Sequence, residues 1–467
     1  MHEYSETIIK GKNHNREKRL GSLDKKYRIK YLKKKEIKRS ETMSRAKTNG
    51  LLFAVCMALV VLAGMLIFTG ECYAYTGVRG AEVSAPAAGN EFVLLEGDFS
   101  YSPKADILKK VNQIRYNACV KGETDPRDHS RKLTVNDYVP VKWSSDLEWM
   151  AQTRAAEAAL YDEHDRPNGR DLMRNGIGGS EILAWSTYDS ADNYIFNCIG
   201  IWMTEHSYWL KGDYAWGGHY AALINPANKY CAIAAFVPTG HNFGAGCGLL
   251  TTRNGLDESQ IGVKGRYLQV IEVKSSMLYV KSDHSVVIDK GARTKAYLKA
   301  VSKYQNGVLD EEENEKIEVL LTSASDWKSK SKTIVATDAA GNVTGLRQGK
   351  GTLTAKYRGH DYSVTAKVID RKKSTPKRVK IKSAKGGKGK FTVKWKKVSK
   401  NTKGYQLHVV DGNGEDCGYA NYKKKTKSKS FYGVPKGTYK IMVRAYNTVY
   451  GEKIYGPWSK VKTVKVK

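Results

Sequence analysis

Hydrophobic positions in this 467-residue chain are spaced differently in successive parts of the sequence. An uninterrupted apolar run occupies residues 51–68. Between 103 and 210, apolar residues recur every three or four positions, which is the period of a helix with one buried face. Beyond residue 273 they alternate with polar residues, as in strands with one buried face. The pattern therefore predicts a partly helical domain followed by all-β domains.

Three apolar stripes predict helices in the first of these domains. Their members are Ile107, Val111, Ile114 and Ala118 in the first, Leu147, Ala151, Ala155 and Ala158 in the second, and Tyr194, Cys198, Ile201 or Trp202, Glu205 and Trp209 in the third. Two short apolar runs, at 230–237 and 266–273, predict strands. Helices that pack on a small sheet form an α+β domain, which we place at residues 104–273. We expect residues 75–103, ahead of this domain, to be a linker.

The alternating region predicts two further domains, at residues 274–370 and 375–467. Val364, Ala366 and Val368 alternate with polar residues near the end of the first. In the second, three predicted strands each carry apolar residues on one face: Phe391, Val393 and Trp395; Tyr405, Leu407 and Val409; and Tyr439, Ile441, Val443 and Ala445. The fold class is therefore multidomain, with an α+β domain followed by two all-β sandwiches.

The apolar run at 51–68 predicts that the chain is exported. It follows a basic segment, and small residues at Cys72 and Ala74 offer a signal-peptidase site, so that residues 51–74 would be a cleaved signal peptide. An uncleaved signal anchor is the alternative, because 18 apolar residues reach the lower limit for crossing a bilayer. In both cases the basic residues 1–50 would be cytoplasmic and the later domains extracellular. Met43 is a second candidate for the start of the chain.

The formal charge of +32 is concentrated at the two ends of the chain. Residues 1–50 carry 16 Lys and Arg against 6 Asp and Glu, and residues 371–467 carry 28 against 4. Residues 51–370 are nearly neutral, with 35 against 37. Because a nucleic-acid-binding protein usually carries its charge on its main domain, and because this chain is predicted to be exported, we expect no nucleic-acid partner.

The cysteines leave several readings open. Four of the seven lie between 119 and 247, where they allow two disulfides in three pairings, or small buried side chains. None has the spacing of a zinc ribbon. A nucleophilic Cys198 or Cys231 paired with a histidine is conceivable, but both cysteines lie in apolar runs, which favours buried, unreactive thiols.

Four polar residues do not fit the apolar surroundings that the pattern predicts for them. Glu205 lies on an apolar helix stripe between two tryptophans, where a carboxylate is costly unless it is paired. His219 follows two glycines, His164 precedes a turn-forming stretch, and Glu181 begins an apolar run. Two histidines and two glutamates are suited either to hold a divalent cation such as zinc or to act as general acids and bases.

The same residues carry a resemblance to the CAP superfamily (cysteine-rich secretory, antigen 5, pathogenesis-related 1), called the SCP domain in bacteria. The motifs are, in order, ILKKVNQIR, VKWSSDLEWMAQTRAAE, EHDRPNG, Trp202-x-x-Glu205 and Gly218-His219-Tyr220. The resemblance implies an α-β-α sandwich with a central tetrad of His164, Glu181, Glu205 and His219. It implies that the histidines hold zinc and that the carboxylates line the same cleft. The family's Gly-Glu-Asn is replaced here by Gly-Ser-Glu-Ile.

The two later domains resemble immunoglobulin-like families. Residues 327–355 are similar to the bacterial Ig-like (group 2) pattern, on Trp327, Val335, Ala336, Gly341, Val343, Thr344, Gly345, Gly351 and Ala355. Residues 375–467 resemble a fibronectin type III domain, in which Tyr439 would be the late-strand tyrosine that is bonded back to the backbone. The many lysines there are read as a solvated face that protects sheet edges, or alternatively as a contact with anionic wall polymer or membrane.

Two functions follow from these observations. The first is a secreted or cell-surface module whose cleft binds a cell-wall polymer, a lipid or a protein. The second is a metal-dependent hydrolase of peptides or cell-wall material, with His164 and His219 as metal ligands and Glu181 and Glu205 as catalytic carboxylates. The sequence favours binding over catalysis and leaves open whether the protein is an enzyme.

Overall fold

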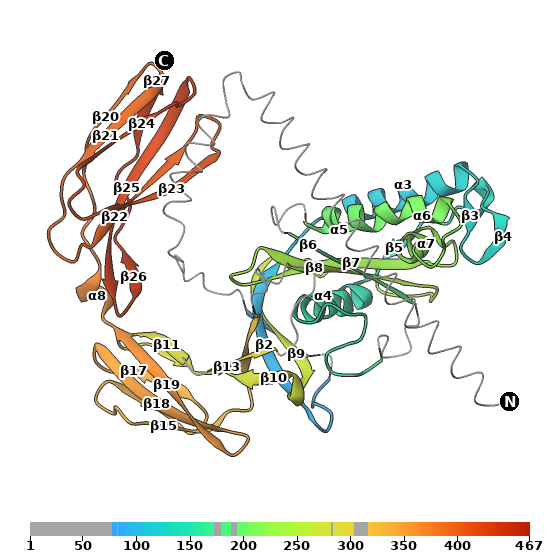
Figure 1. Cartoon of the computed structure of the whole chain (residues 1–467), viewed down its shortest axis with the longest axis horizontal. Helices are drawn as coiled ribbons and strands as arrows, with labels where there is room; N and C mark the ends of the chain where they lie inside the picture. Colours follow the sequence, from blue (N-terminus) through green and yellow to red (C-terminus); the bar gives the residue numbers. More distant parts are fainter. Residues whose placement is uncertain (1–76, 82, 172–178, 188–193, 282–283, 303–315) are drawn as a thin grey trace, which may run out of the picture. The chain divides into compact units, whose positions relative to one another are not determined.

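The computed structural model describes residues 77–467 except 82, 172–178, 188–193, 282–283 and 303–315. The expected basic region 1–50 and signal segment 51–74 lie outside these residues. Within the described part of the chain, no helix is both long and apolar enough to cross a membrane. The described residues divide into two compact units, one ending at Asp370 and one formed by Arg371–Lys467 (Figure 1).

A large sheet forms the centre of the first unit. Its main path is β10-β13-β14-β2-β7-β8-β6, and β1, β5 and β9 pair alongside this path. The strands that the helical part contributes to this sheet are β1 (Gly77–Arg79), β2 (Asn90–Phe99), β5 (Lys142–Trp143), β6 (Ser180–Thr187), β7 (Tyr230–Pro238), β8 (Phe243–Thr251) and β9 (Gly265–Lys274). The strands expected at 230–237 and 266–273 are confirmed as β7 and β9.

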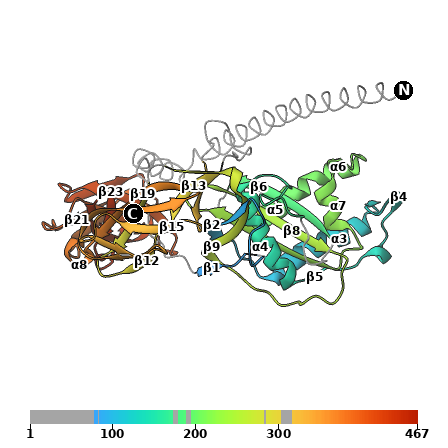
Figure 2. The same cartoon turned by 90° about the horizontal axis from the view of Figure 1, so that it is seen from below.

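Helices cover both faces of this sheet. Helix α4 lies on one face, and α3, α5, α6 and α7 lie on the other (Figure 1; Figure 2 gives the view from below). Strands β7 and β8 are consequently buried along their whole length. The helices are α3 (Lys104–Val120), α4 (Ser145–Leu160), α5 (Tyr194–Trp202), α6 (His206–Leu210) and α7 (Gly218–Ile224). The α-β-α layering that the resemblance implied is therefore present.

The predicted apolar stripes are buried in all three helical segments. The first two stripes lie inside α3 and α4. Helix α4 is buried nearly all round, and Ser144 begins it by accepting a hydrogen bond from the Leu147 N–H. The third stripe is not one continuous helix, because a 3₁₀ turn at Met203–Glu205 separates α5 from α6. Glu205 lies in this turn and is only partly buried.

The expectation of a linker over 75–103 is wrong for residues 90–99, which form β2. This strand pairs with β9 along its whole length and with β7 at one end, and its Val93, Leu95 and Phe99 belong to the core. It was missed because a strand buried on both faces reads as a short apolar run, here FVLL, rather than as an alternating pattern.

Strands from the second predicted domain extend the same sheet. They are β10 (Leu278–Val280), β13 (Leu298–Ser302) and β14 (Glu318–Leu321), and β14 pairs with β2. Buried Glu91 of β2 strengthens the connection, because it accepts hydrogen bonds from the Tyr357 hydroxyl at 2.6 Å, from the Ser323 hydroxyl at 2.7 Å, and from Arg358. The predicted domains 104–273 and 274–370 therefore share one sheet and one hydrophobic core.

Two smaller sheets complete the second predicted domain. One has the order β11-β19-β18-β15 and the other β12-β17-β16. Their strands are β11 (His284–Asp289), β12 (Arg293–Lys295), β15 (Ser325–Ser329), β16 (Val335–Thr337), β17 (Asn342–Gly345), β18 (Gly349–Tyr357) and β19 (His360–Ile369). Gly341 has φ of 83°, and a Cβ there would lie 2.8 Å from the indole nitrogen of Trp327. A side chain at residue 341 would therefore collide with the Trp327 indole, which is a physical reason for glycine at this position.

The second unit begins with a short helix, α8 (Arg371–Ser374), and continues as a sandwich of two sheets. One sheet is β20-β21-β24, and the other is β23-β22-β25-β26 with β27 also paired to β25. The strands are β20 (Ile381–Gly387), β21 (Lys390–Trp395), β22 (Gly404–Val410), β23 (Asp416–Lys423), β24 (Ser428–Tyr432), β25 (Gly437–Val449), β26 (Glu452–Tyr455) and β27 (Lys462–Val466). All the residues predicted to face its core are buried. The Tyr439 hydroxyl donates to the Pro435 carbonyl at 3.0 Å, which confirms its predicted bond to the backbone.

Candidate functional site

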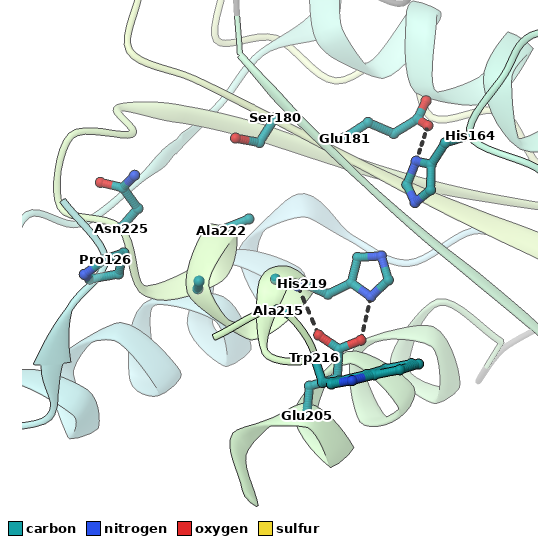
Figure 3. Close-up of a pocket in the computed structure, with 12 residues that line it drawn as sticks. Pro126, His164, Ser180, Glu181, Glu205, Ala215, Trp216, His219, Ala222 and Asn225 are labelled. Carbon is teal, nitrogen blue, oxygen red and sulfur yellow. Dashed lines mark hydrogen bonds and ion pairs between the residues drawn. The ribbon is translucent and has the colours of Figure 1, made fainter. Parts of the chain in front are cut away.

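The four predicted site residues line one cavity in the helical part of the chain. The cavity has a volume of about 650 Å³, and it is also lined by Trp216 and Asn225 (Figure 3). Glu181 comes from β6, Glu205 from the 3₁₀ turn before α6, and His219 from the first turn of α7. His164 lies just beyond the end of α4. The fold therefore brings together residues that are up to 55 positions apart in the sequence.

Glu205 and His219 form the first of two His–Glu pairs. The His219 backbone N–H donates to Glu205 Oε2 at 2.8 Å, and its ring Nδ1 is 2.7 Å from Oε1. Both side chains are partly exposed, at 27% for His219 and 22% for Glu205. Because the carboxylate contacts both the backbone and the ring, it fixes the orientation of the imidazole.

Glycine before His219 has a packing role in this arrangement. A Cβ at Gly217 would lie 3.1 Å from the Trp209 ring, so the residue lets the loop pack directly on that indole. Gly218 has open space around it. Neither glycine has a positive φ, so the turn needs the small side chain of Gly217 rather than left-handed backbone.

His164 and Glu181 form the second pair, and Arg154 is its third member. His164 Nδ1 lies 2.9 Å from Glu181 Oε1, and Arg154 Nε donates to Oε2 at 2.8 Å. The Arg154 guanidinium also donates to the carbonyls of Glu163 at 2.6 Å and His164 at 3.0 Å. Glu181 is 1% exposed and Arg154 3% exposed, whereas His164 is 55% exposed. Arg154 thus holds both the carboxylate and the loop that carries His164.

Our sequence reading did not identify Arg154. One feature of the sequence could have indicated it: Arg154 lies within the mostly apolar helical stretch QTRAAEAAL. A charged side chain is costly to bury there unless it has a partner of opposite charge. A second buried pair lies beside it, since Arg166 donates twice to Glu157 at 2.8 Å. At the position of the family's Asn, Ile182 is buried in the core. The Asn position is therefore apolar here, and Arg154 supplies the hydrogen bonds to Glu181 in this corner of the site.

Tyr220, the last residue of the Gly-His-Tyr motif, anchors α7. Its hydroxyl donates to Glu123 Oε2 at 2.8 Å, and His206 Nε2 lies 2.9 Å from the other oxygen of that carboxylate. Burial, with the neighbouring Glu123 charge, raises the pKa of Tyr220 well above its ordinary value. The hydroxyl therefore remains protonated and donates its hydrogen bond to Glu123, which connects α7 to the segment that follows α3.

The two histidine rings lie close together across the cavity. Their centroids are 5.8 Å apart and their planes differ by 26°. Because an ionised carboxylate only accepts hydrogen bonds, Nδ1 of each ring carries the proton and Nε2 keeps its lone pair in the neutral ring. Figure 3 shows these second nitrogens turned toward the space between the rings. The geometry presents two unshared electron pairs to one small volume.

The donor set suits a divalent cation. His164 and His219, whose ring centroids lie 5.8 Å apart, would be the protein ligands, because imidazole nitrogen is a common ligand of zinc. Metal-binding histidines commonly donate their other N–H to a carboxylate, as both do here. No group of three or more His, Cys, Asp or Glu in the described part of the chain is arranged to hold an ion. Water or a bound ligand would therefore complete the coordination.

Cysteines take no part in the site. Cys119, Cys198, Cys231, Cys247 and Cys417 are all free thiols, so no disulfide forms among the described cysteines. Burial raises the pKa of Cys198 and of Cys231 to about 12. A thiol of that pKa is almost fully protonated at neutral pH, which agrees with the expectation of buried, unreactive side chains.

Comparison with known proteins gives one family match, and it falls in the helical part of the chain. Residues 108–247 match the family model described as "CAP: Cysteine-rich secretory protein family". No curated protein matches the chain. Among solved structures, the FN5 domain of Drosophila Lar is 22% identical and covers 20% of this chain and 96% of its own, with a TM-score of 0.16. The FN1–FN3 domains of chicken CNTN1 are 13% identical and cover 50% of this chain and 82% of their own, with a TM-score of 0.23.

TM-scores this low support no inference about the chain. The β domains are defined by the strand pairing within the chain itself. The helical part has independent support, because the matched residues contain most of α3, all of α4 through α7, and the four predicted site residues that line the cavity. Residues 108–247 of this chain therefore form a domain that matches the CAP, or cysteine-rich secretory protein, family.

Proposed function

We propose that this is an extracellular protein, secreted or attached to the cell surface, whose CAP cleft binds a ligand with the help of a divalent cation. One observation carries the proposal: each carboxylate of the cleft is bonded to the Nδ1 of a histidine, and both Nε2 atoms face the cavity. The polar groups of the site are thus arranged to orient two imidazoles. The family match and the apolar segment at 51–68 support the extracellular location.

Burial of Glu181 favours binding over catalysis. This carboxylate is 1% exposed and forms an ion pair with Arg154. A general base must reach the proton that it removes, and this buried carboxylate is already bonded to both Arg154 and His164. Glu181 is therefore better suited to position His164 than to activate water.

His164 and His219 would hold the cation. When bound, the ion would offer open coordination positions to an oxygen or nitrogen atom of the ligand. Glu205 and Glu181 would keep the rings in the orientation and tautomer that direct Nε2 inward. Trp216 contributes at the rim, since its side chain lines the cavity and the residue is 48% exposed. An exposed indole beside polar groups is suited to contact the apolar face of a ligand.

Ligand capture by the full chain tests this function. We would incubate the protein with cell-wall and membrane extracts, with and without zinc, and identify retained molecules by mass spectrometry. Wild type should retain a molecule that His164→Ala/His219→Ala and Trp216→Ala both lose. A Ser180→Ala variant, altered at a cavity residue that contacts neither histidine, should retain it. Retention of the same molecules by all four proteins would contradict binding in the cleft.

A metal-dependent hydrolase is the second candidate, and Glu205 is the observation in its favour. It is 22% exposed and lines the cavity, so water can reach it. If Glu205 is a general base, Glu205→Gln should abolish cleavage of peptide or cell-wall substrates by a zinc-loaded protein without lowering its melting temperature. Unchanged turnover would exclude this role.

A further inference from the structure

The second unit has a sheet face on which all the charged side chains are lysines. We propose that the outer face of the β20-β21-β24 sheet binds a linear anionic polymer, one with phosphate or carboxylate groups along its length, through Lys385, Lys390 and Lys394. This surface belongs to the unit formed by Arg371–Lys467, so the proposal does not depend on the function of the CAP cleft.

Strand alternation places these lysines on one surface. Along β21, Lys390, Thr392 and Lys394 alternate with three side chains that are buried in the core of the sandwich. Lys385 of β20 and Ser430 of β24 pair with Thr392 from either side. A strand rises about 3.4 Å per residue, so Lys390 and Lys394 lie about 14 Å apart, and neighbouring strands add about 5 Å sideways. The three charges therefore span several repeats of a polymer chain.

Acidic residues are absent from this face. The second unit, all of which is described, contains four acids, and three of them, Asp411, Glu415 and Asp416, belong to the β22–β23 hairpin. The fourth, Glu452, begins β26. All four lie on elements of the opposite sheet, and within the described chain no ion pair involves Lys385, Lys390 or Lys394. A merely solvated surface usually mixes both signs of charge, so this segregation favours an anionic partner.

Edge protection accounts at most for Lys385, on the edge strand β20, and does not explain the two lysines of β21. Lysines that prevent edge-to-edge association lie on edge strands, often pointing inward. Lys429 of the edge strand β24 fits that role, because it pairs with the buried Val393 and its Nζ lies 5.7 Å from the centre of the Tyr422 ring. Lys390 and Lys394 instead belong to β21, the middle strand of the three. Their position points to a binding surface.

The neighbouring side chains favour a hydrated polymer over a membrane. Thr392 and Ser430 carry hydroxyls 2.8 Å apart, and Ser428 lies opposite Lys394. Tyr432, which is 68% exposed, lies opposite Lys390 and is the one large hydrophobic residue exposed on this face. Stable attachment to a membrane surface usually needs several inserted apolar side chains in addition to charge. Hydroxyl donors and a single aromatic ring suit a chain of polar repeats.

Binding of the full chain to long-chain inorganic polyphosphate and to polyglutamate tests the proposal. The test variant is Lys385→Gln/Lys390→Gln/Lys394→Gln. The matched control is Lys423→Gln/Lys440→Gln/Lys462→Gln, which removes three exposed lysines from the opposite sheet. Both variants have the same net charge, and melting temperature verifies their folding. Vesicles containing anionic lipid form a third arm.

We expect the face variant to lose about tenfold or more in affinity for at least one polyanion at 0.1 M salt. Its plot of log K against log salt should become shallower by about two to three, because fewer counterions are released. The control should change about twofold or less. Equal losses in both variants would show that only net charge matters and would overturn the proposal. So would a preference for anionic vesicles, or the absence of measurable binding to either polymer.

Discussion

The imidazoles of His164 and His219 face one another across the cleft with ring centroids 5.8 Å apart, and each ring bonds through Nδ1 to a different glutamate. The two pairs differ in setting. Glu205 is partly exposed, whereas Glu181 is buried and bonded to Arg154. One half of the site is thus open to water, and the other is supported by a buried ion pair. This difference makes the two halves separable by mutation.

Replacing Glu205 with Gln should weaken zinc binding to the full chain. The amide NH₂ can donate to Nδ1 and favour the tautomer with its proton on Nε2, which removes the lone pair that faces the cavity. Loss of such an outer-shell partner typically costs 10- to 100-fold in metal affinity. Titration calorimetry measures the effect, with Ser180→Ala as a control that should bind as wild type does. Equal affinities for wild type and Glu205→Gln would contradict the orienting role.

Arg154→Met should destabilise the first unit by about 3–5 kcal/mol. It leaves the buried Glu181 carboxylate without its guanidinium partner, and uncompensated buried charge is strongly unfavourable. Denaturant unfolding monitors the change. The double variant Arg154→Met/Glu181→Gln should recover part of the loss, because the unpaired charge is gone. A loss below about 1 kcal/mol would mean that the pair contributes little.

Glu91→Ala should uncouple the CAP part from the strands that follow it. The substitution leaves Tyr357 and Arg358 without their buried acceptor and removes the side-chain link beside the β2–β14 pairing. We expect a loss of about 2–3 kcal/mol and a broader or split calorimetric transition. Ser323→Ala, which removes one neutral donor from the same carboxylate, should cost about 1 kcal/mol and keep one transition. An unchanged transition in Glu91→Ala would contradict the coupling.

The thiols should react in an order set by burial. Burial raises the pKa of Cys198 and Cys231 to about 12, so at pH 8 only about one molecule in 10⁴ carries either thiolate. Among the cysteines that the structure describes, Cys417 is partly exposed and should react first with iodoacetamide in the native protein. Peptide mass spectrometry, with a Cys417→Ser control and a denatured sample, follows the labelling. Labelling of native Cys198 as fast as Cys417 would be inconsistent with the structure.

Acid should loosen the rim of the cleft near Pro126. The Arg127 side chain lowers the pKa of Asp125 to about 2, with a further hydrogen bond from Arg131. Because this value is below that of an unfolded Asp, about 3.9, the contribution is complete above about pH 4 and is lost as pH falls through about 2. The hydrogen-exchange protection of residues 121–138, measured relative to the intrinsic exchange rate at each pH, should fall over that window. Asp125→Asn should exchange faster at pH 6 and lose this pH dependence.

Local spacing was sufficient to locate several elements of the fold. The stripes in α3 and α4 and the alternation in β21, β22 and β25 follow from a period that each segment carries by itself, and their predicted faces are buried. Strand β2 escaped this reading because burial on both faces removes the alternation. Nothing in the local sequence indicates that β14 pairs with β2, since that contact joins residues more than 220 positions apart.

Sequence motifs identified His164, Glu181, Glu205 and His219 as candidate site residues. Their chemistry suggested a divalent-cation site or a set of general acids and bases. Their pairing was decided by packing: α4 brings Arg154 to Glu181, and Gly217 lets the loop before α7 lie on Trp209. Composition likewise showed a strongly basic C-terminal region. The sandwich alone placed Lys385, Lys390 and Lys394 on one face and the acids on the other sheet. Periodicity depends on neighbours along the chain, whereas these arrangements depend on contacts between residues distant in sequence, which form only when the chain is folded.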